Sequence, residues 1–210
     1  MLDIIRGLKA VQQQIDLLMA QLESLVPDSG DRVAETCRGL SNTPFCVAEH
    51  MNANAYEPLI PGVWLGFAKK APVQVRQHLR ADSGSDDRSY AFTISTGAAF
   101  QSGWLTLEFL LARAEIITKN SLSINIELSS NATGHLLFAV KAHGREIEPR
   151  FTELAKYDIE GGTLHVTDIA SLGRAVPGIS DEFHDIRILV FLPPLANATY
   201  TFSCLRLGLL

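Results

Sequence analysis

Two glutamates, Glu108 and Glu127, are the side chains best suited to catalysis, and each falls in a segment whose pattern predicts a β-strand. Carboxyl groups about 5–9 Å apart across a groove hydrolyse glycosidic bonds, one as the acid and the other as the base or nucleophile. The pattern puts both residues on polar strand faces, where single charged side chains are ordinary solvated surface. A glycoside-active enzyme is therefore one alternative, and solvated glutamates are the simpler interpretation.

A broader set of polar residues, together with one tryptophan, is better suited to binding a sugar. The ring of Trp104 can stack on the apolar C–H face of a pyranose, while planar polar groups bind its hydroxyls in pairs. A Trp104 buried under a loop or between sheets is the alternative, because tryptophan is highly buried on average. The predicted ligand-binding residues are Gln74, Arg76, His78, Trp104, Glu108, Asn125 and Glu127.

The sequence contains no motif for nucleotide binding, for metal-dependent hydrolysis or for a catalytic serine. The six histidines lack the close spacing of a strand-borne metal pair. The segment Asp82–Asp87 carries three acidic side chains, which is typical of a soluble turn, with a calcium-binding loop as the alternative. We therefore predict no catalytic residue, no metal site and no cofactor.

The strands that carry these residues are indicated by strict period-2 alternation, which is clearest in Ser121–Leu128. Turn-forming residues separate the strands, and no room remains for crossover helices, so the pattern predicts an antiparallel β-sandwich or jelly roll. We interpret Glu148–Lys156 as a loop or helical turn. The predicted strands are Val63–Phe67, Val73–Arg80, Arg88–Ser95, Trp104–Arg113, Ser121–Leu128, Leu136–Ala142, Thr163–Ile169, Asp185–Leu192 and Thr199–Leu207.

The apolar members of these strands define the expected core. Beyond Phe202 the alternation changes face at Leu205, Leu207 and Leu209, which a β-bulge or burial against a neighbour would explain. Cys204 is expected in the core. The predicted inward residues are Val73, Val75, Tyr90, Phe92, Ile94, Leu105, Leu107, Phe109, Leu122, Ile124, Ile126, Leu136, Phe138, Val140, Leu164, Val166, Ile186, Ile188, Val190, Tyr200 and Phe202.

Residues 1–26 form a second clear pattern. Apolar residues from Met1 to Leu25 alternate in spacings of three and four, which is the heptad seam of a coiled coil. The flanking e and g positions carry no charge, so identical chains can meet without repulsion, and the aliphatic seam favours a trimer at least as well as a dimer. The alternative is one amphipathic helix packed on its own sandwich.

Composition excludes several classes of function. The chain has 210 residues and a net charge of -5, so no basic stripe favours nucleic acid. No apolar run is long enough for a membrane span, and the N-terminus does not resemble a signal peptide. The expected location is the cytoplasm, a particle, or the exterior by a non-classical route. Cys37 and Cys46 could pair only in an oxidising compartment.

These patterns divide the chain into a helical oligomerisation segment (1–26), an irregular connector (27–62, with a short helix possible at Val33–Leu40) and a β-sandwich (63–210). In architecture alone, this arrangement is similar to lectins, carbohydrate-binding modules, adhesins and phage receptor-binding proteins. We therefore expect a non-enzymatic, multivalent glycan-binding protein that self-associates. A structural subunit of a phage particle or surface assembly is the second hypothesis, and the glycoside-active enzyme is the third.

Overall fold

A computed structural model describes residues 32–42, 45, 51–69, 71–79, 90–111, 119–144, 149–172 and 183–210. The chain divides into two compact units, Met1–Gly30 and Asp31–Leu210, and all described residues belong to the second. The predicted coiled coil in residues 1–26, the Asp82–Asp87 segment and Cys46 lie outside the described residues.

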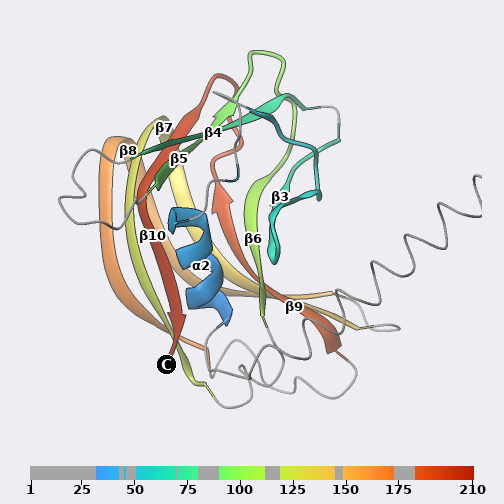
Figure 1. Ribbon diagram of the computed structural model, residues 1–210, viewed down its shortest axis with the longest axis vertical. Helices are drawn as coiled ribbons and strands as arrows, with labels where there is room; N and C mark the ends of the chain where they lie inside the picture. Colours follow the sequence, from blue (N-terminus) through green and yellow to red (C-terminus); the bar gives the residue numbers. More distant parts are fainter. Residues whose placement is uncertain are drawn as a thin grey trace, which may run out of the picture. The chain divides into compact units, whose positions relative to one another are not determined.

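The described residues form one helix and a ten-stranded antiparallel sheet (Figure 1). This confirms the predicted mainly-β antiparallel sandwich. The elements are α2 (Arg32–Asn42), β1 (Met51–Asn52), β2 (Pro58–Ile60), β3 (Val63–Gly66), β4 (Val73–Leu79), β5 (Tyr90–Thr96), β6 (Leu105–Leu111), β7 (Ser121–Gly144), β8 (Arg150–Ser171), β9 (Phe183–Leu192) and β10 (Thr199–Leu209).

The long strand β7 joins the two layers of the sandwich. Its first part pairs with β10 and its last part with β9, giving the order β1-β4-β5-β10-β7-β9-β6-β3-β2. We call β4, β5, β10 and the first part of β7 the first layer, and β9, β6, β3 and the last part of β7 the second layer. Strand β8 pairs with β7 in both layers, and the two strands curve together from one layer into the other (Figure 1).

The bend explains why the sequence suggested separate strands. Glycines at positive φ, Gly161 (76°) and Gly162 (97°) in β8, lie opposite a register shift between Ser130 and Thr133 in β7. Turn residues therefore bend the strand pair here without ending it. The predicted loop or helical turn at Glu148–Lys156 is wrong, since β8 begins at Arg150. The alternation of apolar and polar residues in this part of β8 is broken by a second register shift, which lies opposite Phe138 and Ala139 of β7.

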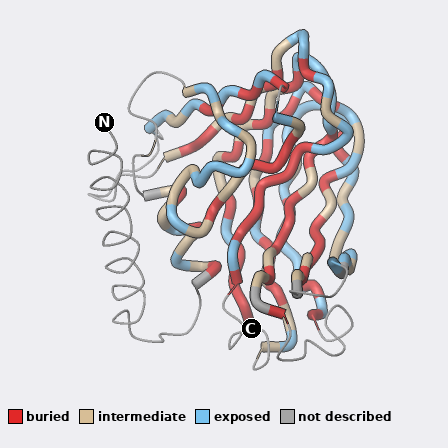
Figure 2. Tube along the Cα trace, turned by 90° about the vertical axis from the view of Figure 1, so that its right-hand side faces the viewer, coloured by how far each residue is buried: buried red, intermediate tan, exposed pale blue. Residues whose placement is uncertain are grey.

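The core lies between the layers and matches the predicted inward set. Those side chains are buried except Tyr90 and Leu164, which are half-buried. Figure 2 shows the buried positions, in red, along the strands. Phe92 and Phe202 stack with ring centroids 4.9 Å apart, one from β5 and one from β10. Each large side chain buried in this way contributes roughly 1.5–3 kcal/mol.

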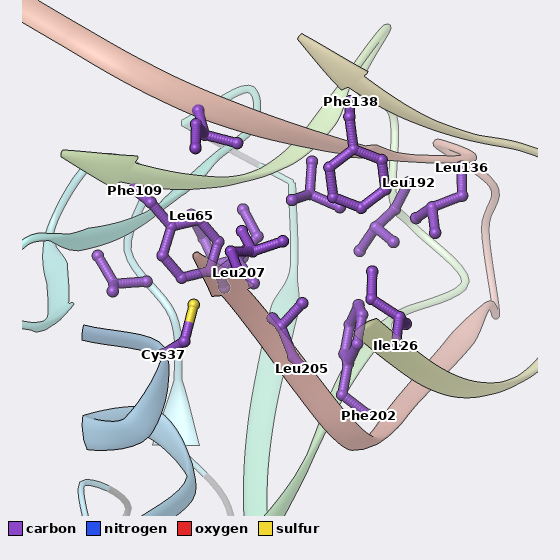
Figure 3. Packing of buried hydrophobic residues seen from close by; sticks show 14 of the residues in the cluster. Cys37, Leu65, Phe109, Ile126, Leu136, Phe138, Leu192, Phe202, Leu205 and Leu207 are labelled. Carbon is purple, nitrogen blue, oxygen red and sulfur yellow. The ribbon is translucent and has the colours of Figure 1, made fainter. Parts of the chain in front are cut away.

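Helix α2 confirms the short helix expected within 27–62. Val33, Cys37 and Leu40 are spaced four and three apart, so they share one face of the helix, and all three are buried in the core. Figure 3 shows the Cys37 side chain pointing toward Leu65 and Phe109. Beyond the helix, Gln77 of β4 donates to the Leu40 carbonyl at 3.2 Å, which satisfies one of the carbonyls that a helix end leaves unpaired.

A β-bulge in β10 moves the later leucines into the core, as the sequence predicted. The register against β7 shifts between Phe202 and Cys204, and Leu205, Leu207 and Leu209 are buried. Cys204 was expected in the core but is half-buried on the outer side of the sheet. The bulge lies between Phe202 and Cys204, so the alternation of inward and outward side chains changes before Cys204 is reached. Among the described residues, no helix has both the length and the apolarity needed to cross a membrane.

Candidate functional site

The outer side of the first layer is a largely polar surface built by five neighbouring strands, with the exposed Ile169 of β8 at its edge. Cross-strand pairing places the outward residues of β4, β5, β10, β7 and β8 in rows across the sheet. We call this surface the polar face. Its polar members are Gln74, Arg76, His78, Thr93, Ser95, Ser123, Asn125, Glu127, Ser129, Thr163, His165, Thr167, Thr199, Thr201 and Arg206.

One row across the polar face begins at Arg76 and ends at Thr163. Arg76 pairs with Thr93, which pairs with Thr201, and the row continues through Ser129. The hydroxyls of Thr93 and Thr201 are hydrogen-bonded at 3.0 Å, and those of Ser129 and Thr163 at 3.1 Å. These mutual bonds hold the hydroxyl oxygens in fixed positions, so ordering them for a ligand costs little side-chain entropy.

Two further rows cross the strands beyond the bulge. Arg206 pairs with Asn125, which pairs with Thr167, and Glu127 pairs with His165 on one side. Asn125 and Arg206 are exposed, while Glu127 is half-buried. The rows therefore offer amide, guanidinium and carboxylate groups on the same side of the sheet.

Five of the seven predicted ligand-binding residues lie on the polar face: Gln74, Arg76, His78, Asn125 and Glu127. The other two, Trp104 and Glu108, lie in the second layer or beside it, so the predicted set does not form one surface. The strand alternation could place each residue on an outer face, but it could not say which strands are neighbours.

Trp104 lies immediately before β6 and is 40% exposed. Its backbone carbonyl accepts a 2.6 Å hydrogen bond from the Ser102 hydroxyl, which also accepts from the Trp104 amide at 3.3 Å. The alternative of a fully buried tryptophan is therefore wrong. The exposed ring is available at a place away from the polar face.

Glu108 was expected on a wet strand face, and that expectation is wrong. Its side chain is 4% exposed, and Arg187 donates to its Oε2 at 3.0 Å while the Thr106 hydroxyl donates to its Oε1 at 3.0 Å. A Cβ at Gly66 would meet Thr106 Oγ1, Glu108 Oε1 and the ring of Tyr56. The sequence could not show that Glu108 lies beside Gly66, because the two residues belong to different strands.

The buried glutamate belongs to a charged group that sequence reasoning missed, which we call the Arg187 cluster: Trp64, Glu108, Asp185 and Arg187. Arg187 binds Asp185 through two hydrogen bonds of 2.8 and 2.7 Å and lies over the Trp64 ring at 4.5 Å. Such a fork geometry fits a carboxylate closely. The Asp185–Arg187 spacing, two residues on one strand face, is the signal that could have suggested the pair.

The charges of this cluster stabilise one another. Hydrogen bonding to Asp185 raises the pKa of Arg187, although burial opposes the rise. Burial acts to raise the pKa of Asp185, but the hydrogen bonds and charge of Arg187 outweigh it, and that pKa is lowered. Burial, and then the charge of Lys141, lower the pKa of His143. The cluster therefore holds polar groups that satisfy one another's hydrogen bonds, which is the pattern of a structural network.

The two glutamates of the enzyme hypothesis are not brought together. Glu127 lies on β7 between β10 and β8, whereas Glu108 lies on β6 between β3 and β9. Glu108 is also hydrogen-bonded to Arg187 and Thr106. Within the described ranges, no three histidine, cysteine or acidic side chains gather as a metal site would require.

No protein-family model matches the chain, and no curated protein matches its sequence. Solved structures with a similar arrangement of strands include the family 11 carbohydrate-binding module of a Clostridium thermocellum cellulosomal cellulase. That module is 8% identical with a TM-score of 0.43, and the match covers 77% of this chain and 94% of the module.

Two further structures extend the comparison. The C-terminal family 22 carbohydrate-binding module of Clostridium thermocellum Xyn10B is 12% identical with a TM-score of 0.44, covering 78% of this chain and 96% of that one. A domain of tailspike protein 4 from bacteriophage CBA120 is 9% identical with a TM-score of 0.41, covering 82% of this chain and 21% of that one. The likeness concerns the arrangement of strands.

Proposed function

We propose that this chain is a non-enzymatic glycan-binding protein and that the polar face is its binding surface. The observation that carries the proposal is the register of the sheet. It places Gln74 and Arg76 of β4 on the same outer side as Asn125 and Glu127 of β7, in different rows across the sheet, although about fifty residues separate the two pairs in the sequence. An extended sugar chain lying on this side would meet polar groups along its whole length.

The chemistry of the polar face suits hydroxyl recognition. Amide and guanidinium groups donate, carboxylate and amide oxygens accept, and the serine and threonine hydroxyls do both. The sheet backbone holds these groups in place, so binding need not order a loop first. Gln74, Arg76, His78, Asn125 and Glu127 are the proposed contacts, whereas Trp104 and Glu108 are left out because they lie elsewhere in the sandwich.

A screen of immobilised glycans with the intact protein, followed by replacement of the proposed contacts, tests this function. The double variant Gln74→Ala with Asn125→Ala should bind about tenfold or more weakly, since each lost hydrogen bond is worth about 1 kcal/mol. Trp104→Ala, which removes an exposed side chain outside the polar face, is the matched control and should bind normally. Silence across all glycans, or loss of binding only in Trp104→Ala, would reject the polar face.

Self-association is the second part of the proposal and rests on the heptad pattern of residues 1–26. Individual sites on an open sheet face are expected to be weak, because such a face encloses little of its ligand. Linking several copies can raise avidity by about 10²–10⁴ without a new contact. A trimer would carry three polar faces in one oligomer.

A structural subunit that makes protein contacts is the second candidate function. The exposed apolar side chains of β8 favour it: Phe151 is 56% exposed and Ile169 is 63% exposed. Among the described strands, β8 pairs only with β7, so its other edge carries backbone groups that could pair with a partner. Replacing Phe151 and Ile169 with threonine should lower the assembly state in light scattering if this function is correct.

A further inference from the structure

The ionisable side chains of the polar face are mostly basic, although the chain as a whole is acidic. Among its described residues, two arginines, Arg76 and Arg206, and two histidines accompany a single carboxylate, Glu127. The whole chain has a net charge of -5. The polar face thus carries more positive than negative side chains, although the net charge of the chain is negative.

We propose that the polar face binds an anionic polysaccharide, one whose sugar rings carry carboxylate or sulfate groups. This inference rests on the proposed glycan-binding function and specifies its ligand class. Guanidinium groups recognise such oxyanions through two parallel hydrogen bonds, which are roughly twice as strong as bonds between neutral groups.

Both arginines are available for a ligand. Arg76 and Arg206 are exposed, and neither has an ion-pair partner among the described residues. Arg187 provides the contrast, because Asp185 and Glu108 occupy its guanidinium. Arg187 is thus neutralised within the second layer, whereas Arg76 and Arg206 are presented to solvent on the first layer.

The spacing of the two arginines favours a polymer over a single sugar. Arg76 and Arg206 lie on β4 and β10, which are separated by β5, so the strands are about 10 Å apart. Arg76 is level with Thr201, and Arg206 lies five residues further along β10 with the bulge between them. The separation is roughly 17 Å at ordinary strand spacings. A ligand that reaches both must extend over several rings.

Glu127 gives the inference a distinctive test. It lies next to the Asn125–Arg206 row, and its negative charge would repel an anionic ligand. If the ligand were neutral, Glu127 would serve as a hydroxyl acceptor and its loss would weaken binding. With an anionic ligand, Glu127→Gln should tighten binding by about two- to fivefold, since the amide keeps an acceptor and removes the charge.

The experiment compares polymers that share a backbone and differ in charge, using the full chain and isothermal calorimetry. Polygalacturonate is paired with its methyl ester, and dextran sulfate with dextran, so that the carboxylate and sulfate sources are distinguished. The variants are Arg76→Gln, Arg206→Gln and Glu127→Gln. The control is Arg38→Gln, which removes an exposed arginine of α2. Unchanged melting temperatures show that each variant is folded.

The expected result is binding to at least one charged polymer and about tenfold weaker binding to its neutral counterpart. Arg76→Gln and Arg206→Gln should each lose about tenfold, while Arg38→Gln stays within about twofold. Equal binding to charged and neutral polymers would overturn this inference and leave the glycan-binding function standing. Binding to no polysaccharide of any kind would reject both. If inorganic polyphosphate bound equally tightly, the polar face would recognise negative charge without recognising a sugar. That result would also overturn the inference.

Discussion

The Tyr157 hydroxyl donates a 2.7 Å hydrogen bond to Asp168 Oδ2, although the two residues lie eleven positions apart on the same strand, β8. A straight strand would hold them roughly 36 Å apart. They meet because β8 bends at Gly161 and Gly162, so that both side chains lie on its inner side. The bond therefore links the two parts of β8 on either side of the bend.

Removing this bond with Tyr157→Phe should destabilise the protein by about 0.5 kcal/mol, a value kept small because Asp168 is exposed to solvent. Urea unfolding monitored by fluorescence measures the change. Tyr56→Phe is the control, since it removes the hydroxyl of another partly exposed tyrosine. An equal loss in both variants would show that the bend does not depend on the Tyr157 hydroxyl.

The same bond predicts a pH dependence. Hydrogen bonds from Tyr157 and from the Ile169 amide lower the pKa of Asp168. A carboxyl with a lowered folded-state pKa contributes stability above its unfolded-state pKa and loses that contribution as the pH falls through the folded-state value. The stability difference between wild type and Tyr157→Phe should therefore shrink in acid below the ordinary aspartate range. A difference that grew on acidification would contradict this assignment.

Gly66→Ala should destabilise the second layer by about 1–3 kcal/mol, the usual cost of overpacking. The added methyl group would meet Thr106 Oγ1 and Glu108 Oε1, both of which are held by hydrogen bonds. Gly103→Ala is the matched control, because a Cβ there meets nothing within 4 Å. Thermal unfolding of the two variants should separate them by several degrees.

Glu108→Ala should cost about 3–5 kcal/mol, because it leaves the Arg187 cluster without one of its carboxylates in a largely buried position. Glu127→Ala, on the polar face, should change stability by less than about 0.5 kcal/mol. Chemical denaturation of both variants tests the contrast. A stable Glu108→Ala protein that had lost a measurable hydrolytic activity would instead revive the enzyme hypothesis.

A chain lacking residues 1–26 should be monomeric in light scattering and should bind a glycan-coated surface about 10²–10⁴ times more weakly. Its affinity for a soluble oligosaccharide, measured per site, should stay unchanged, since the polar face belongs entirely to residues beyond Gly30. If the intact protein is itself monomeric at high concentration, the heptad interpretation is wrong.

Much of the sandwich was predictable because period-2 alternation directly reports which side chains face the core. Leu122, Ile124 and Ile126 were expected inside and are buried. The length of β7 was not predictable, because Asn131–Gly134 has the composition of a turn and here only bends the chain. The first part of β8 was missed because the extra residue near Leu154 breaks the alternation by which a strand is recognised.

The candidate site was predictable only in part, for a related reason. Alternation places Asn125 and Arg76 on outer faces, but long-range pairing decides that β4 and β7 share a layer. Alternation also cannot say what covers an outer face. Glu108 has the same local pattern as Glu127, yet Glu108 is buried beside Gly66 and bound to Arg187, whereas Glu127 is half-buried on the polar face.

The bulge in β10 has a practical consequence for Cys204. By turning this residue outward, it sets a thiol beside Glu127 and Asn125, next to the surface on which a ligand would lie. Alkylation of Cys204, followed by peptide mass spectrometry, should slow when that surface is occupied, whereas the buried Cys37 should stay unreactive throughout. The fold thus supplies its own footprinting reporter, with no engineered label.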